Sequence, residues 1–521
     1  MTKLLTWLTS PDKRLYSATL LYYACLYFVN ANIWLLLLTC GYIAVIYLIT
    51  KQTLLTLWLA LLVTLPLAKG KTLNFSLLDK AALTSRNAVF DVGYILSFYV
   101  SDFILSLLLI KLTQKWWQQR SQIKLLATKF KSKIPSWQKL GLCLTWLTFL
   151  IVALLPHSQS YLWPIIALST LELIKLTLIF LIPSWLLILN QPTKIGQQNF
   201  IQATLQVVMA SIWFQAAWSS LQFLTGGPLG KYIEAILPLG AQGQAIALGT
   251  MENWEILRVT GSFFDPSLLG TFLVTAISWL WYNQKQLQPK WWLWLTMLAA
   301  LGTVILTSNR ILMLIMLIWI IWELKHWLKS KQNLFASLKK NLTSLPTLVV
   351  GLILILGTIS LSPYILTRMS SLNRVFDQYG SATYRLQLGW YGIRLGMSNF
   401  WGVGLNLSPY YLATGFNQET VSFDPSHPHN LWLQLFAETG WIGASLFLVG
   451  IYLIYRPIAK SSSQAKLDWQ MSGWGKAGLM FLICAQFYPV FINQIEVASW
   501  LALMLGGHWA SRQNWSKKLA K

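Results

Sequence analysis

Two histidines and an asparagine stand at the start of an apolar helix near the end of the chain, in the stretch SHPHNLWLQLFAETGWIG over residues 426–443. His429 would lie at the first helical turn, where backbone N–H groups are unpaired and face the preceding loop. A neutral imidazole is a competent general base near neutral pH, because its unperturbed pKa is about 6.5. The simpler alternative is an interfacial histidine that only hydrogen-bonds a loop carbonyl. His427 is a second candidate, but Pro428 separates the two, and the following Asn430 favours His429.

Three arginines from separate segments, Arg258, Arg310 and Arg385, are candidates for holding an anion. A guanidinium presents its N–H groups as a fork that matches phosphate oxygens in pairs, and it keeps its charge at physiological pH. Together the three would form a clamp for a doubly charged anion. The alternative for each of them is that the side chain snorkels to phospholipid headgroups.

A buried carboxylate, Glu438, lies nine residues after His429 in the same apolar helix. Nine residues place the two on roughly opposite helix faces and about 13 Å apart along the axis, so Glu438 can only be a supporting residue. An ionisable group inside a membrane span costs roughly 2.5–3.5 kcal/mol and usually faces a partner or a cavity. Gly440 and Gly443 would let another helix approach closely. The pattern predicts buried hydrogen bonding and close packing around Glu438.

Composition decides which solvent these residues face. The chain has 521 residues, of which 55% are hydrophobic and 11% charged, and its mean hydropathy is +0.53. Apolar runs of about 18 residues or more recur along it, which is typical of helices that cross a bilayer. The sequence therefore predicts an all-α, polytopic transmembrane helical bundle of about 12–14 spans, formed by residues 1–521 as a single integral membrane domain. The cysteines at positions 25, 40, 143 and 484 all fall in apolar runs, which indicates buried thiols rather than disulfides.

The expected spans follow from hydropathy alone. They lie near residues 15–29, 33–50, 53–68, 88–110, 139–155, 163–187, 199–224, 263–282, 291–307, 311–328, 346–362, 430–455, 475–492 and 495–510.

Orientation follows from the basic residues, of which there are 40 against 16 acidic ones, for a net charge of +24. In a membrane protein this excess indicates cytoplasmic loops rich in Lys and Arg, here 111–140, 325–340 and 456–466, rather than nucleic-acid binding. Threading the spans between these loops places both termini inside. The candidate arginines and histidines then converge on the outer face, and residues 363–429 form one long extracytoplasmic loop.

One stretch of that loop, YRLQLGWYGIRLGM over residues 384–397, carries apolar side chains at helical spacing. Leu386, Trp390, Ile393 and Met397 would share one face of a helix. An amphipathic helix of this kind is expected to lie along the membrane surface.

Four segments, taken in order, resemble the O-antigen ligase and O-antigen polymerase superfamily. They are RVTGSFFDPSLLGTFL, ILTSNRILML, YRLQLGWYGIRLGMSNFWGVGLN and HNLWLQLFAETGWIGASLFL. The resemblance covers about residues 200–460, which would be the catalytic region. No segment before residue 200 adds to it.

The resemblance implies a metal-independent, inverting glycosyltransferase without a cofactor. Its donor would be a glycan on a polyprenyl diphosphate, usually undecaprenyl diphosphate. Its acceptor would be a glycan, a lipid or a protein. The arginines would hold the diphosphate and stabilise charge on the leaving group, and His429 would deprotonate or orient the acceptor hydroxyl. The enzyme would lie in the bacterial inner (plasma) membrane, among its lipids, with the active site on the extracytoplasmic side.

Two alternatives stay open. Ligase and polymerase chemistry need the same clamp and the same base, so the sequence does not separate them. A transporter of a small anion or solute is a different class, and it would show broken spans and polar groups at the bilayer midplane. The conspicuous polar groups here gather towards one face instead. Two histidines with no cysteine nearby give too few ligands for zinc, so no metal site is predicted.

Overall fold

The structure is a computed structural model that describes most of the chain in sixteen separate stretches. These are residues 11–67, 70–74, 95–120, 136–154, 163–190, 194–231, 248–251, 254–263, 265–287, 290–330, 381–408, 411, 428, 430–456, 473–487 and 495–513. His427 and His429 both lie outside the described residues, as does the predicted span 346–362.

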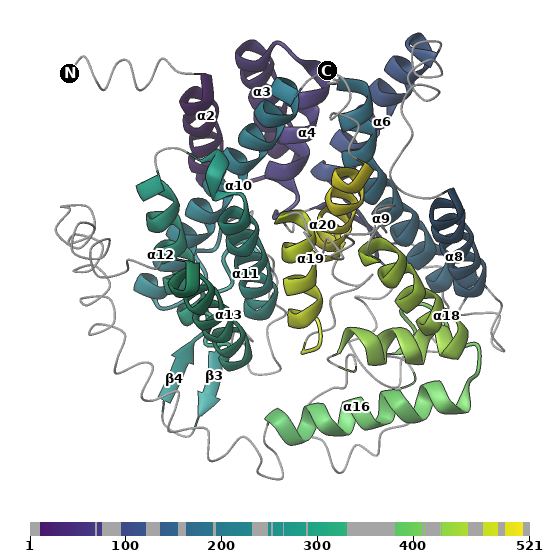
Figure 1. The fold of residues 1–521 in the computed structure, drawn as a ribbon. Helices are drawn as coiled ribbons and strands as arrows, with labels where there is room; N and C mark the ends of the chain where they lie inside the picture. The colour runs from purple at the N-terminus through teal and green to yellow at the C-terminus, as the bar shows by residue number, and fades with distance from the viewer. Residues whose placement is uncertain are drawn as a thin grey trace, which may run out of the picture.

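Helices dominate the described residues, which confirms the predicted helical bundle (Figure 1). The first half of the chain contains α2 (Pro11–Cys25), η1 (Leu26–Phe28), α3 (Asn32–Thr50), α4 (Thr53–Thr64), α6 (Val100–Gln118), α8 (Ser136–Leu154), α9 (Trp163–Asn190) and α10 (Lys194–Thr225). The second half contains α11 (Pro266–Tyr282), η4 (Gln284–Gln286), α12 (Lys290–Leu306), α13 (Arg310–Ser330), α16 (Ser381–Ser398), α18 (Leu431–Tyr455), α19 (Gly473–Cys484) and α20 (Ile495–Gln513).

Two short antiparallel strand pairs join the helices, and the sequence did not predict either of them. The strands β1 (Gly70–Asn74) and β2 (Ile95–Tyr99) form one pair, and β3 (Leu248–Met251) and β4 (Trp254–Leu257) form the other. The span expected over residues 88–110 is therefore wrong within its described part, because residues 95–99 form β2 and α6 begins only at Val100.

Several helices have the length and composition of membrane spans. Within the described residues, five are long and apolar enough to cross a bilayer: Ile33–Thr50, Ser136–Leu154, Ser169–Leu186, Phe200–Thr225 and Leu431–Tyr455. Shorter apolar helices are Thr53–Thr64, Pro266–Tyr282, Trp291–Leu306 and Gly473–Cys484. The protein is thus a multi-pass membrane protein, and the total of 12–14 spans stays a prediction.

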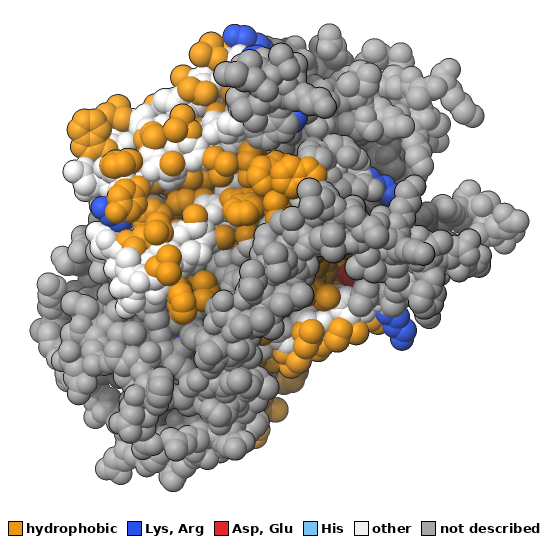
Figure 2. All heavy atoms as spheres, turned by 90° about the vertical axis from the view of Figure 1, so that its left-hand side faces the viewer, with side chains coloured by type: hydrophobic (Ala, Val, Ile, Leu, Met, Phe, Trp, Pro, Cys, Tyr) orange, Lys and Arg blue, Asp and Glu red, His pale blue; other side chains and the backbone are white. Residues whose placement is uncertain are grey.

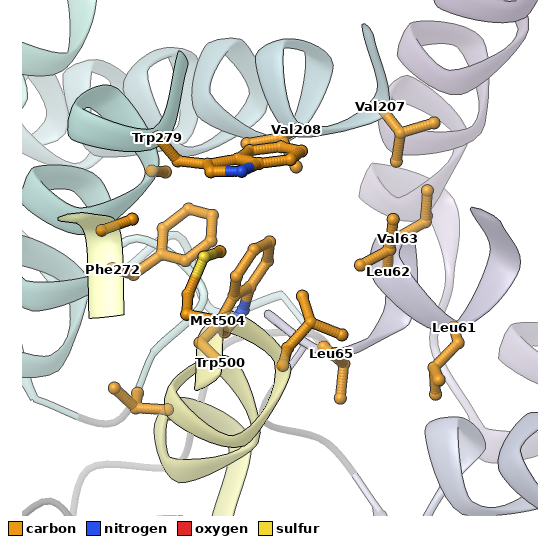
Figure 3. Packing of buried hydrophobic residues seen from close by; sticks show 14 of the residues in the cluster. Leu61, Leu62, Val63, Leu65, Val207, Val208, Phe272, Trp279, Trp500 and Met504 are labelled. Carbon is orange, nitrogen blue, oxygen red and sulfur yellow. The ribbon is translucent and has the colours of Figure 1, made fainter. Parts of the chain in front are cut away.

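The interior is packed with large apolar side chains from helices far apart in the sequence (Figure 3). Phe272 of α11 meets Trp500 of α20 edge to face, with ring centroids 4.9 Å apart. Val207 and Val208 of α10 face the same cluster from another side. Together with side chains from α4, these residues fix α4, α10, α11 and α20 around one core.

The exterior is also apolar, as a lipid-facing surface must be. Hydrophobic side chains gather on the face that Figure 2 shows, which is the side formed by α2, α12 and α13 in Figure 1. On α13 these include Leu314, Leu317, Ile318, Ile321 and Trp322, all exposed. So many exposed large apolar side chains on one face are unusual on a water-soluble protein and are expected where the surroundings are lipid.

Candidate functional site

Arg258 lies in an irregular turn, residues 258–263, between strand β4 and helix α11. The backbone of the turn meets the junction of α12 and α13, where Val259 N–H donates to the carbonyl of Leu306 at 3.4 Å. The guanidinium Nε of Arg258 donates to the carbonyl of Thr307 at 3.3 Å. The side chain of Arg258 is therefore directed towards the tight turn that carries Arg310.

That tight turn is built from small polar residues. Thr307, Ser308 and Asn309 are buried, and Ser308 adopts a left-handed backbone conformation with φ of 54°. The Asn309 side chain accepts a hydrogen bond from the backbone N–H of Leu312 at 3.2 Å and so caps α13. The turn delivers Arg310 at the first position of α13.

The structure thus places Arg258 and Arg310 within electrostatic reach of each other, and their joint role as an anion clamp stays a prediction. Arg310 precedes the predicted span 311–328, so it would lie at the predicted membrane boundary. Burial and the positive charge of Arg258 both lower the pKa of the Arg310 guanidinium. Two guanidinium groups within electrostatic reach of each other repel, and an anion bound between them would relieve that repulsion.

Two glutamines of α10, which the sequence analysis missed, hold the turn from the other side. Gln222 accepts from the backbone N–H groups of Thr260 and Gly261 at 3.1 and 2.9 Å. Gln215 accepts from the backbone N–H of Ser262 at 3.0 Å. The signal that could have found them is their spacing, because two amides seven residues apart in an apolar span share one face.

Arg385 stands on α16, which confirms the helix predicted over residues 384–397. In Figure 1, α16 lies across one end of the bundle rather than along it. Three glycines follow Arg385 at helical spacing: Gly389, Gly392 and Gly396. They form a stripe along which α16 packs closely on neighbouring segments. A β-carbon on Gly389 would touch Leu433, and one on Gly396 would collide with Phe436, both on α18.

The same stripe of α16 also touches the segment that carries the histidines. A β-carbon on Gly392 would lie 3.1 Å from the ring of Pro428. Pro428 is flanked in sequence by His427 and His429, whose own positions lie outside the described residues. Arg385 is two helical turns before Gly392 on this stripe, so its helix packs beside the chain that bears both histidines.

Asn430 caps α18 and ties its start to the end of α19. Its side-chain oxygen accepts from the backbone N–H groups of Trp432 and Leu433 at 2.9 and 3.1 Å. Its Nδ2 donates to the carbonyl of Gln486 at 2.7 Å. The Leu431 N–H donates to the carbonyl of Ala485 at 2.9 Å. The sequence led us to expect unpaired N–H groups facing the loop. That expectation is wrong for Leu431, Trp432 and Leu433.

Glu438 is 1% exposed and hydrogen-bonded, which confirms the predicted buried bonding. Its Oε1 accepts from Ser408 Oγ at 2.7 Å and from Gln434 Nε2 at 3.1 Å. The backbone N–H of Gly404 donates to the backbone carbonyl of Glu438 at 2.9 Å. The loop after α16 is thereby fastened to the middle of α18.

The prediction that Gly440 admits a neighbouring helix is wrong. Gly440 breaks α18, with φ of 63° and ψ of −165° inside the helix. What approaches it is the backbone of the loop after α16, since a β-carbon there would collide with the carbonyl of Phe400 and the N–H of Gly402. The nearest atoms to Gly443 belong to Thr439 of its own helix.

The two groups of site segments lie at the same end of the bundle. Trp279 near the end of α11 packs on Trp474 near the start of α19, with ring centroids 4.4 Å apart. The two helices are therefore antiparallel neighbours, and the start of α11, next to the Arg258 turn, is level with the end of α19. Asn430 is bonded to that end, and α16, β3 and β4 lie there too (Figure 1).

The opposite end holds residues that the sequence predicts to be cytoplasmic. Tyr455, the last residue of α18, donates to the carbonyl of Gly475 at 2.8 Å, at the start of α19. Its ring stacks on His508, near the end of α20, with centroids 5.0 Å apart. The structure therefore separates Arg456 from the arginine-bearing turns by the length of the bundle.

These features define a helical membrane protein with cationic and capping residues gathered at one end. Residues 267–448 match the model of the O-antigen ligase family. This match confirms the resemblance over that segment. No curated protein matches the chain.

The match covers part of the predicted catalytic region, residues 200–460. It takes in Arg310, Arg385, Asn430 and Glu438, together with both histidines, but it begins after Arg258. Among the described residues, no three His, Cys, Asp or Glu side chains lie together in a way that could hold a metal ion. The assignment of roles to individual residues stays a prediction.

Proposed function

We propose that this protein transfers a glycan from a polyprenyl diphosphate to an acceptor hydroxyl at the extracytoplasmic surface of a bacterial inner membrane. The observation that carries the proposal is the pairing of Arg258 with Arg310 at a membrane boundary. A diphosphate attached to a prenyl tail is a dianion at that depth, and paired guanidinium forks match its oxygens. The family match supports the same substrate class.

The proposed reaction is a single displacement. The acceptor oxygen attacks the anomeric carbon, and the bond from that carbon to the diphosphate oxygen breaks. The electron pair leaves with the polyprenyl diphosphate, where Arg258, Arg310 and Arg385 stabilise the charge. His429 takes the proton from the acceptor hydroxyl as it attacks. One displacement inverts the anomeric configuration.

Supporting residues hold the groups in place in this proposal. Asn430 fixes the start of α18 directly after His429, through its cap and its bond to Gln486. Glu438 fastens the loop that follows the Arg385 helix. His427 is the alternative base, because the sequence permits either histidine to face the acceptor.

The test is transfer by purified protein in lipid nanodiscs supplied with a labelled glycan on undecaprenyl diphosphate. Wild type is expected to release the lipid diphosphate, whereas His429→Ala and Arg385→Ala lose at least 100-fold in rate, a typical scale for general-base and electrostatic contributions. Arg394→Ala is the matched control, because Arg394 is on the same helix but exposed. Full activity of both test variants in folded protein would refute the mechanism.

The products separate the two enzyme types. A ladder of longer lipid-linked glycans would mean a polymerase, and release only after a second acceptor is added would mean a ligase. The alternative of anion transport is not favoured by the family match. Folded wild-type protein that turns over no lipid-linked glycan but moves an anion across vesicles would establish transport instead.

A further inference from the structure

Gln215 and Gln222 of α10 stand out because they are amides buried in an apolar helix. Their side chains are 0% and 3% exposed. Burying an amide without hydrogen bonds costs on the order of 2–7 kcal/mol, so such residues persist where they have fixed partners. Here both side chains bond the turn that begins at Arg258.

The side-chain amide of Gln222 forms hydrogen bonds with backbone groups of the turn. Its Oε1 accepts from the N–H groups of Thr260 and Gly261, and its Nε2 donates to the carbonyl of Gly261 at 3.0 Å. These groups belong to no helix or strand, so within the bundle they need side-chain partners. The amide of Gln222 supplies both a donor and an acceptor to one residue.

Gln215 extends the same contact to Ser262. Its Nε2 donates to Ser262 Oγ at 2.6 Å, and that hydroxyl in turn donates to the carbonyl of Pro66 at 2.9 Å. Gly261 has φ of 60°, and a β-carbon there would collide with Gln215 Oε1. Any other residue at position 261 would therefore be strained by the backbone angle and would have to displace the Gln215 amide from its bond to Ser262.

Two parts of the bundle hold the turn that begins at Arg258. The glutamines of α10 bind residues 260–262, and the junction of α12 and α13 binds Val259 and the Arg258 side chain. Burial and the positive charge of Arg258 lower the pKa of Arg310, so the two guanidinium groups lie within electrostatic reach of each other. A turn without these anchors would let the two guanidinium groups move apart, and binding would then have to bring them back together.

We infer that Gln215 and Gln222 are positioning residues that hold Arg258 beside Arg310 and thereby set the affinity for a polyprenyl diphosphate. The inference rests on the proposed function, because it takes the anion to be that diphosphate. The family match begins after Arg258 and excludes both glutamines. The role is therefore assigned from the geometry of this chain.

The test is a double-mutant cycle on binding of radiolabelled undecaprenyl diphosphate, without a glycan, to protein in nanodiscs. Gln222→Met keeps the side-chain length and removes the hydrogen bonds. It is expected to weaken binding about tenfold, as is Arg258→Ala, since coupled residues interact by 0.5–3 kcal/mol. The double variant should bind no more weakly than Arg258→Ala alone, because the glutamine acts through the arginine.

A matched control is available at another contact of α10, the one it makes with α12. Trp213 of α10 donates to Thr296 Oγ1 of α12 at 3.0 Å, away from the turn. Thr296→Val removes that buried bond and should leave binding within about twofold while costing comparable thermal stability. If Gln222→Met does not fold, Ser262→Ala takes its place in the cycle, because it removes the bond that the other glutamine, Gln215, donates to the same turn, with the loss of one oxygen.

Each result decides something. Additive losses in the double variant, or wild-type binding by Gln222→Met, would overturn the inference and leave the proposed function standing. Failure of folded wild-type protein to bind the lipid diphosphate would overturn the proposed function, and this inference with it. A cycle in which the glutamine matters only when Arg258 is present supports both.

Discussion

Replacing Asn430 with alanine tests whether the start of α18 is held rigidly where the sequence places the candidate base. The asparagine makes three hydrogen bonds: two accepted from Trp432 and Leu433 and one donated to Gln486. Alanine removes all three and leaves two backbone N–H groups without their cap. The first turn of α18 should open more often as a result.

The size of the effect follows from the bonds lost. Removal of an N-cap side chain costs about 1 kcal/mol, and the further bond to Gln486 adds about 1 kcal/mol. A sum of about 2 kcal/mol corresponds to roughly a 30-fold loss of protection, because each 1.4 kcal/mol is tenfold. Hydrogen exchange at the amides of Trp432 and Leu433, read by mass spectrometry on protein in nanodiscs, measures it.

Two further variants sharpen this prediction. Asn430→Ser keeps a capping oxygen but not the donor to Gln486, so protection should fall only about fivefold. Asn399→Ala removes a bond to Leu395 at the end of α16 and should not change exchange at Trp432. Unchanged protection in Asn430→Ala would refute the reasoning, and so would equal losses in Asn430→Ala and Asn399→Ala.

Substitutions at three other positions have defined outcomes. Gly440→Ala should lower the thermal unfolding temperature. The φ of 63° and ψ of −165° at this position cost any residue other than glycine about 1–3 kcal/mol, even before its β-carbon collides with Phe400. An unfolding temperature equal to that of wild type would contradict this. Glu438→Gln keeps an oxygen for Ser408 and should stay near wild-type stability, whereas Glu438→Leu strands Ser408 Oγ at a cost of about 1–3 kcal/mol. A calorimetric scan in which Glu438→Leu is as stable as Glu438→Gln would contradict this. Arg310→Ala should weaken binding of undecaprenyl diphosphate, and binding by wild type should show no titration of Arg310 between about pH 6 and 9, because a guanidinium with a lowered pKa still stays protonated in proteins.

Much of this fold is predictable because hydropathy and charge act locally. Apolar runs predict the helices, and basic loops predict which ends of the helices lie on one side. The same side assignment predicts that Arg258 and Arg310 lie on one side of the membrane, and the structure directs the Arg258 side chain to the carbonyl of Thr307, in the turn before Arg310. The helix over residues 384–397 is equally predictable, since its apolar side chains recur at helical spacing.

What the sequence did not predict depends on contacts between distant segments. A glycine inside a helix permits either close packing or an unusual backbone angle, and only the position of Phe400 decides for Gly440. The cap at Asn430 was likewise hidden, because its second partner, Gln486, is 56 residues away. The strand at 95–99 was missed because an apolar run of that length fits a strand as well as a helix.

The two irregular stretches of the site share one physical solution, and that is the reason to look for function in them. Non-helical backbone inside a membrane bundle is tolerated where protein groups satisfy its N–H and carbonyl groups. Gln215 and Gln222 do so for the turn after Arg258, and Glu438 does so for the loop after the Arg385 helix. Each buried polar side chain would be costly in an uninterrupted span. A fold that needed only stable helices could do without these residues, so their presence beside the arginines favours a site that must be held in a fixed shape.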